Sequence, residues 1–347
     1  MLVSAEKHAR AITSDPSTGL IAISKHLEES VASGYGVLKV SSIESTRHEF
    51  VPLHTHAVKD ICFSPHANSV LLSCSKNKEL KLTDLKSNTC AQKYKIDGEG
   101  WSCNWSGTTN NVVYCGIQNG TVHVFDIRNT RGPITNLSGG AVTGGVSQRC
   151  PVISVISVPY SQTTVPGMLV STLQGITFWT PERSGGCGYE PSFLGVSPGA
   201  LSSVCLEPNS GTILASYRPG MKCPTERHIV STLTTSMDKP PSLHKQSEFH
   251  GAASQCLRAK SCLIKAPGEG TDLMVCAGNQ VTNVVNVWST EKSECIQSWN
   301  IRKEDGPILS VVPHRADGSD FLCVLTDQKM FQYKWLSPGD STMPMVC

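Results

Sequence analysis

One pentapeptide has the spacing of a catalytic serine: Gly195-Val196-Ser197-Pro198-Gly199. In serine hydrolases such an elbow exposes the hydroxyl between a strand and a helix, beside backbone N–H groups that stabilise an oxyanion. Here the pentapeptide leads into ALSSVCLEP, which alternates like a strand rather than a helix. We therefore interpret it as a turn that enters a strand.

Two histidines, His54 and His56, lie two residues apart and would share one face of an extended segment. Two imidazoles can begin a zinc site, but the sequence suggests no third ligand nearby. We predict no metal here, and interpret one of the two as a structural histidine that holds a turn by hydrogen bonding.

Other catalytic patterns are missing from the sequence. Neither G-x-x-x-x-G-K-[ST] nor G-x-G-x-x-G occurs, so no phosphate-binding loop is predicted. No pair of carboxylates on adjacent strands indicates glycosidase chemistry. We expect a non-catalytic chain that binds no cofactor.

Four lysines crowd the segment SKNKELKLTDLK: Lys76, Lys78, Lys81 and Lys86. On a hairpin the first two bracket the turn and project from its rim. A solvated edge that discourages strand pairing is the default interpretation, and docking of an acidic protein surface is the alternative.

The composition of the 347-residue chain favours β structure. Charged residues make up only 17% of it, and 29 glycines and 20 prolines indicate many turns, whereas helical proteins usually carry more Glu, Lys and Ala. The formal net charge of +2 gives no sign of the concentrated basic face that nucleic acid requires. No run of about 18 apolar residues occurs, so no membrane span is predicted.

The 15 cysteines stand singly, mostly inside apolar runs, and include no C-x-x-C pair. An odd number without paired spacing indicates reduced thiols in the cytosol or nucleus. We predict structural roles for them, because a buried cysteine packs as a small hydrophobic residue.

The segment VVYCGIQNGTVHVFDIR, residues 112–128, predicts a β-hairpin. Apolar positions alternate in both arms, and β-branched residues dominate them. Asn119-Gly120 between the arms is a strong hairpin signal, because both residues tolerate positive φ. We expect positive φ at both.

The same order of strands and turns recurs along the chain, for example in residues 57–85 and again in 100–128. One further short β-like run, such as HEFVPLH or CAQKYKI, separates successive copies. Four strands per unit, at a spacing of roughly 40–55 residues, is typical of a β-propeller blade.

We therefore predict an all-β fold: one seven-bladed propeller over residues 1–347, with four-stranded antiparallel blades. The predicted blades span about 8–53, 54–97, 98–140, 150–196, 198–250, 254–301 and 306–336. The last copy has only three strands, and the N-terminal MLVSAEKHA can supply the fourth. Such a strand closes the ring and removes the free sheet edges that invite aggregation.

Loop residues at one end of this ring are the predicted binding face. In a propeller, connections between blades and turns between second and third strands meet at one end of the central channel, where partners usually bind. The predicted face residues are His56, Lys76, Asn77, Trp101, Gln118, Asn119, Gln174, Ser202, Tyr217, Arg218, Asn279, Gln280, Pro307 and Asp327. Trp, Tyr and Arg most often anchor protein interfaces. For each residue, ordinary turn chemistry or core packing is the alternative.

The ends of the predicted third strands resemble the Trp-Asp dipeptide of WD-repeat propellers. They read Leu-Thr-Asp at 82–84, Phe-Asp at 125–126, Phe-Trp-Thr at 178–180 and Val-Trp-Ser at 287–289. One histidine of HTHAVKD stands at the position of the family's Gly-His, and asparagine replaces the usual turn aspartate. The hydrogen-bond network that the family uses is therefore expected only in part.

A closer resemblance is carried by SKNKELKLTDL, GWSCNW, VVYCGIQNGTVHVFDIRNT, ASYRP, DLMVCAGNQ and MFQYKW. These segments resemble the C-terminal propeller of the RING-finger and WD-repeat E3 ubiquitin ligases of DNA repair. The similarity covers most of the chain and is strongest over residues 73–130.

This resemblance implies a recognition role. In that family the propeller binds replication protein A at stalled forks and interstrand crosslinks, and a RING finger and coiled coil precede it. A RING holds zinc through C-x-x-C pairs, so we expect zinc only in a separate RING segment of a longer polypeptide. The implied protein is nuclear, and also cytoplasmic, with a monomeric propeller that holds replication protein A or a ubiquitinated client.

Two alternatives stay open at this point. The first is a generic non-catalytic WD-repeat scaffold in another protein complex. The second is a propeller enzyme, which would need a mutually supporting pair of titratable residues at the channel mouth.

Overall fold

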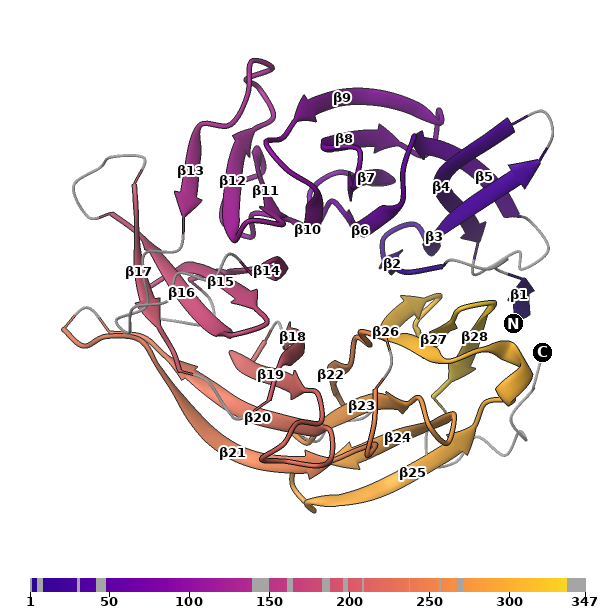
Figure 1. Ribbon diagram of the computed structural model, residues 1–347, viewed down its shortest axis with the longest axis vertical. Coiled ribbons are helices and arrows are strands. Elements are labelled where there is room, and N and C mark those ends of the chain that lie inside the picture. Colours follow the sequence, from indigo (N-terminus) through magenta and orange to yellow (C-terminus); the bar gives the residue numbers. More distant parts are fainter. Residues whose placement is uncertain are drawn as a thin grey trace.

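The computed structural model describes residues 2–4, 9–29, 32–41, 48–138, 150–160, 165–182, 188–195, 199–207, 209–236, 238–255, 257–266 and 271–335. These residues form seven four-stranded antiparallel sheets, arranged as the blades of a ring (Figure 1). The predicted all-β seven-bladed propeller is confirmed. The helical element of the described part is one 3-10 turn, η1 (Lys303–Asp305).

The innermost strand of each blade faces the centre of the ring in Figure 1. In the order of blades 1 to 7 these strands are β2 (Ile12–Asp15), β6 (Val58–Phe63), β10 (Gly100–Trp105), β14 (Val152–Val158), β18 (Leu201–Leu206), β22 (Cys262–Lys265) and β26 (Ile308–Ala316). The second strands are β3 (Leu20–Glu29), β7 (Val70–Ser75), β11 (Val112–Ile117), β15 (Gly167–Thr172), β19 (Thr212–Tyr217), β23 (Leu273–Asn279) and β27 (Ser319–Thr326).

The third and fourth strands complete each blade toward the rim. The third strands are β4 (Ala32–Ser41), β8 (Glu79–Asp84), β12 (Thr121–Asp126), β16 (Gly175–Pro181), β20 (Arg227–Thr234), β24 (Val284–Ser289) and β28 (Lys329–Lys334). The outer strands of blades 1 to 6 are β5 (His48–His54), β9 (Thr89–Lys95), β13 (Thr135–Ser138), β17 (Tyr189–Phe193), β21 (Ser242–His250) and β25 (Glu294–Asn300).

The N-terminal strand β1 (Leu2–Ser4) is the outer strand of blade 7. It pairs antiparallel with β28, in the sheet order β1-β28-β27-β26. The first and last strands of the described chain, β1 and β28, are therefore neighbours in this blade (Figure 1). The predicted closure of the ring by an N-terminal strand is thus confirmed.

The hairpin of β11 and β12 differs from its prediction at the turn. Gly120 has a positive φ of 88°, and Asn119 does not share it. The loop holds three residues, and a loop of this length needs a left-handed residue only at its last position. The Asn119 side chain instead accepts a hydrogen bond from the Thr121 N–H at 3.0 Å.

The core consists of seven apolar clusters of the described residues, one between each pair of neighbouring blades. One cluster joins Leu72 of blade 2 to Phe125 of blade 3, and another joins Ile23 of blade 1 to Met330 of blade 7 across the closure. Each blade therefore depends on both neighbours to remove its apolar faces from water.

Many of the described cysteines belong to these clusters, and all of the described ones are free. The buried ones are Cys74, Cys103, Cys115, Cys262, Cys276 and Cys323. Burial raises the pKa of the Cys323 thiol to about 12. Such a thiol stays protonated at neutral pH and serves as packing volume.

Candidate protein-binding face

The end of the ring that carries the connections between blades and the turns between second and third strands is here called the upper face. Because each blade is antiparallel, these segments meet at one end: Gly100 at the start of β10 pairs with Ile117 at the end of β11. All predicted face residues lie in these connections, in these turns or at strand ends beside them.

Five of the predicted residues present exposed polar side chains on the upper face. They are His56, Lys76, Gln118, Asn119 and Gln174. They stand on turns fixed by the blades behind them, which is the usual way in which a rigid scaffold presents variable contacts.

Two of the predicted residues are interior. Ser202 is only 3% exposed, and its hydroxyl donates to the Ser216 carbonyl at 2.9 Å. Tyr217 is 6% exposed and packs in the cluster between blades 4 and 5. For both side chains the structure therefore selects core packing, the alternative that the sequence leaves open.

Gln280 and Arg218 fix the shape of the face. The Gln280 carboxamide accepts from the Leu257 N–H at 3.0 Å and donates to the carbonyls of Leu257 and Ile308 at 3.1 and 3.0 Å. The Arg218 guanidinium donates to the Gln255 carbonyl at 2.7 Å. These side chains fasten turns to the neighbouring connections, while Asn279, Pro307 and Asp327 are half-buried beside similar turns.

His54 is the structural histidine of the predicted pair. Its Nδ1 lies 3.1 Å from Asn77 Oδ1 and its Nε2 lies 2.9 Å from Ser73 Oγ. A carboxamide oxygen only accepts, so Nδ1 donates and Nε2 accepts from the serine hydroxyl. Burial, assisted by the Lys81 charge, lowers the pKa of His54 to about 4. His56 is exposed.

Acid should weaken the fold through His54. The unfolded chain binds a proton there near about pH 6.5, whereas the folded chain keeps the imidazole neutral, so the free energy of unfolding falls as pH decreases below that value. From about pH 7 to about pH 5, His54 should account for a loss of about 2 kcal/mol. Urea titrations across this range should show that His54→Gln has the shallower pH dependence, and equal slopes would contradict this assignment.

Charged residues meet near the axis of the ring, below the upper face. Lys59 Nζ lies 4.8 Å from the centre of the Trp101 ring, in a cation–π contact. Asp60 Oδ1 lies 2.6 Å from Lys260 Nζ, which joins blade 2 to blade 6, and Asp60 Oδ2 accepts from the Cys103 N–H at 3.2 Å. Trp101 is thus part of a charged inner layer rather than an open contact surface.

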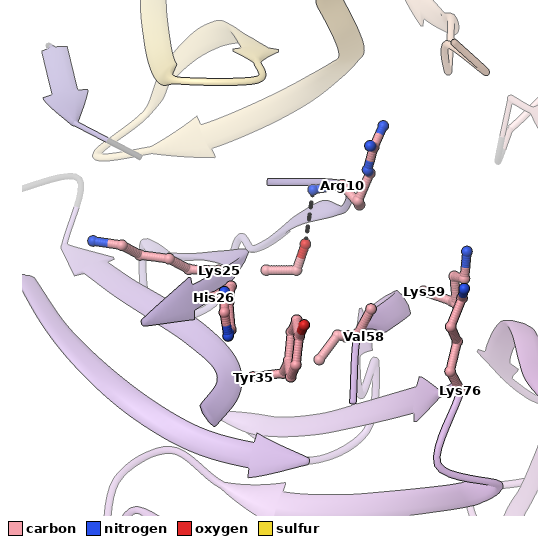
Figure 2. Close-up of a pocket in the computed structure, with 9 residues that line it drawn as sticks. Arg10, Lys25, His26, Tyr35, Val58, Lys59 and Lys76 are labelled. Atoms are coloured by element: carbon pink, nitrogen blue, oxygen red, sulfur yellow. Dashed lines mark hydrogen bonds between the residues drawn. The ribbon is translucent and has the colours of Figure 1, made fainter. Parts of the chain in front are cut away.

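A cavity of about 250 Å³ opens on the upper face between blades 1 and 2 (Figure 2). Its lining residues are Arg10, Ser24, Lys25, His26, Tyr35, Ala57, Val58, Lys59 and Lys76. Lys76 alone among them was predicted for the face. The others come from four separate segments, and only the packing of blade 1 on blade 2 brings them together.

Ser197, the serine with hydrolase-like spacing, lies outside the described residues. Gly195 and Gly199 on either side of it have positive φ angles of 100° and 104°, and the strand β18 begins soon after them. In the described part of the chain, no three His, Cys, Asp or Glu side chains are grouped as metal ligands would be. No described helix is long and apolar enough to cross a membrane.

Comparison with known proteins gives a consistent result. A family model described as the WD40 domain of the E3 ubiquitin-protein ligase RFWD3 matches residues 1–334. The human ligase of that name is 26% identical over 315 residues, which are 89% of this chain and 39% of the relative. The Ailuropoda melanoleuca protein is 27% identical over 315 residues (89% and 39%), and the Mus musculus protein 26% identical over 323 residues (91% and 40%). The chain thus spans about two fifths of the length of these relatives.

Proposed function

The chain belongs to the family of RFWD3 WD40 domains, and from this premise we propose that it is the partner-recognition propeller of a RING-type E3 ubiquitin ligase. The observation that carries the proposal is the family match over residues 1–334. In this proposal the propeller holds a client, and a RING segment elsewhere in the full polypeptide binds zinc and recruits the ubiquitin-charged E2 enzyme. The chain itself contributes binding and no cofactor.

The proposed partner is replication protein A, or a ubiquitinated client bound to it, in the nuclear response to stalled forks and interstrand crosslinks. The resemblance over residues 73–130 supports this choice. The formal net charge of +2 favours a protein partner over nucleic acid, because single-stranded nucleic acid is usually bound along a basic groove. The exposed turns of the upper face are the proposed contacts, and the propeller is proposed to be monomeric.

A binding measurement tests both partner and face. Gln118→Arg places a bulky charge on an exposed turn of the upper face. It should weaken binding of purified replication protein A by at least about tenfold, because disrupting a good interface contact costs about 1–2 kcal/mol. Thr130→Arg is the matched control, because Thr130 is exposed beyond the opposite end of β12. Titration by surface plasmon resonance measures both.

The outcomes separate the possibilities. Binding by wild type that both variants retain would reject the upper face as the contact. Absence of binding by wild type would reject replication protein A as the partner and favour a scaffold in another complex.

A further inference from the structure

The cavity between blades 1 and 2 has a rigid frame. The Ser24 hydroxyl accepts from the N–H groups of Arg10 and Ala11, both at 2.9 Å. On the other side, the Ser75 hydroxyl shares its one proton between the His56 and Ala57 carbonyl oxygens, which lie 2.8 and 2.9 Å away. The backbone that carries the cavity walls is therefore held in place before any ligand arrives, which lowers the entropic cost of binding.

A stacked aromatic pair forms one wall of the cavity. The rings of His26 and Tyr35 lie 4.1 Å apart at an interplanar angle of 19°. These residues belong to a cross-strand pair of β3 and β4, and the Val58 side chain lies beside Tyr35 in Figure 2. This wall offers an apolar and aromatic surface to the flanks of a bound group.

The opposite wall is positively charged. Lys59 and Lys76 stand together on one side of the aromatic pair, whereas Arg10 points away from the pair and Lys25 extends away on the other side (Figure 2). The positive charge of Arg258, in the connection before β22, also lowers the pKa of Lys59. The Nη1 atom of Arg258 is buried without a hydrogen-bond partner.

These cations repel one another in the unliganded protein. Burial lowers the pKa of Lys59, and the charges of Lys76, Arg10 and Arg258 lower it further, against an opposing effect of Glu99. None of the described lining residues is acidic. An anion placed beside Lys59 and Lys76 would relieve this repulsion and gain charge-assisted hydrogen bonds.

The size and charge of the cavity select the ligand class. A volume of about 250 Å³ is below the range of about 300–1,000 Å³ typical of pockets for drug-sized ligands, so it suits one side chain. A phosphoryl group carries nearly two negative charges and three acceptor oxygens, which match the adjacent cations Lys59 and Lys76 (Figure 2) better than a carboxylate does. Further round the upper face, the exposed turn residues Gln118 and Asn119 of blade 3 and Gln174 of blade 4 are neutral, so the basic side chains near the cavity do not continue there as the extended basic track that binds a nucleic-acid backbone.

We propose that this cavity binds a phosphorylated serine or threonine side chain in a peptide segment of the partner. Lys59 and Lys76 contact the phosphoryl oxygens, and the stacked His26–Tyr35 pair contacts the neighbouring residue of the peptide. The proposal rests on the proposed function, since it assigns a chemical class to what the upper face recognises.

Immobilised degenerate peptide libraries provide the probe. One library carries a fixed phosphoserine at its centre, and two others carry serine or glutamate there. The wild-type chain should bind the phosphoserine library selectively. The best peptide from it should lose at least about tenfold in affinity with either Lys59→Gln or Lys76→Gln, because one charge-assisted hydrogen bond is worth about 1.5–3 kcal/mol. Lys95→Gln, an exposed change on β9 of the same blade, should bind as wild type does.

Several results would overturn the proposal. One is binding of the serine or the glutamate library as tight as that of the phosphoserine library. Another is unchanged peptide affinity in both lysine variants, provided that their circular dichroism matches wild type. A third is displacement of the peptide by a single-stranded oligonucleotide but not by phosphoserine. Binding of replication protein A by wild type is measured in parallel. If wild type binds the phosphopeptide but not replication protein A, the proposed partner alone is rejected. If it binds replication protein A but shows no preference for the phosphopeptide, the phosphoryl site alone is rejected.

Discussion

Replacing Gly116 with cysteine should destabilise the propeller by about 3 kcal/mol, near the upper end of what overpacking a core costs. A Cβ atom at Gly116 would lie 2.4 Å from Val152 Cγ1 and 2.5 Å from Ser102 Oγ. Val152 is the first residue of β14 and is fully buried. The backbone of blade 3 would have to move away from blade 4, and the contacts of the cluster between them would be lost.

The neighbouring blade interface shows how this clash can be relieved. Between blades 2 and 3 the size relation is reversed: Cys74 stands at the position of Gly116, and Gly100 at the position of Val152. A Cβ atom at Gly100 would lie 2.8 Å from the Cys74 Cβ. Either arrangement places one side chain in the space between two backbones, and the two interfaces differ in which blade supplies it.

A double-mutant cycle tests this complementarity. Val152→Gly alone should cost about 3 kcal/mol through lost burial and added backbone freedom. Combined with Gly116→Cys, it should cost at least about 2 kcal/mol less than the sum of the single changes, as expected for residues in contact. Urea unfolding measures each free energy, and Gly98→Ala, whose added Cβ would meet only one atom at 3.9 Å, is the near-neutral control. Strict additivity would show that the two positions do not share a space.

The sequence predicts the blades well because their signals are local. Alternation of apolar residues over residues 112–128 marks both arms of a hairpin, and its repetition along the chain sets the number of blades. Predicting the closing strand needed only the observation that the last copy lacks a fourth strand. The prediction of a positive φ at Asn119 was wrong, because loop length rather than residue type decides how many residues take a positive φ.

The candidate site was predicted less completely, because it depends on contacts between blades. Apolar alternation in blade 1 fades after Ser24, yet β3 continues through main-chain pairing of Lys25 with Gly36 and of His26 with Tyr35. This extension carries the aromatic pair over the upper face, and no apolar pattern announces it. A single sequence could have pointed to Lys59, as a charged residue entering an apolar inner strand.

The interior residues of the predicted face show the converse limit. Residue type suggested that Tyr217 is an interface anchor, but aromatic residues serve cores and interfaces equally well. Position at a strand end does not distinguish the two roles. Only the packing of blade 4 against blade 5 encloses this side chain.

Replacing Asp60 with alanine should cost about 3 kcal/mol, as expected when one partner of a largely buried ion pair is removed. The carboxylate pairs with Lys260 at 2.6 Å and accepts the Cys103 N–H, and its charge also attracts the Arg258 guanidinium. Its loss leaves cations facing one another near the axis of the ring and a buried N–H without an acceptor. The Lys260 side chain is 29% exposed, so water offsets part of the penalty and the effect should stay at the lower end of the range.

The charge component of this loss can be separated from the packing component. Asp60→Asn keeps the shape and one acceptor oxygen, so it should isolate the electrostatic part. Adding Lys260→Gln to Asp60→Asn should recover at least about 1 kcal/mol, because contacting residues of one network do not act additively. Raising salt should stabilise Asp60→Asn more than wild type, since mobile anions screen the uncompensated cations. Urea titrations at low and high sodium chloride measure both effects, and identical salt responses would mean that Asp60 acts through its backbone contact to blade 3 rather than by joining blade 2 to blade 6 across the ring.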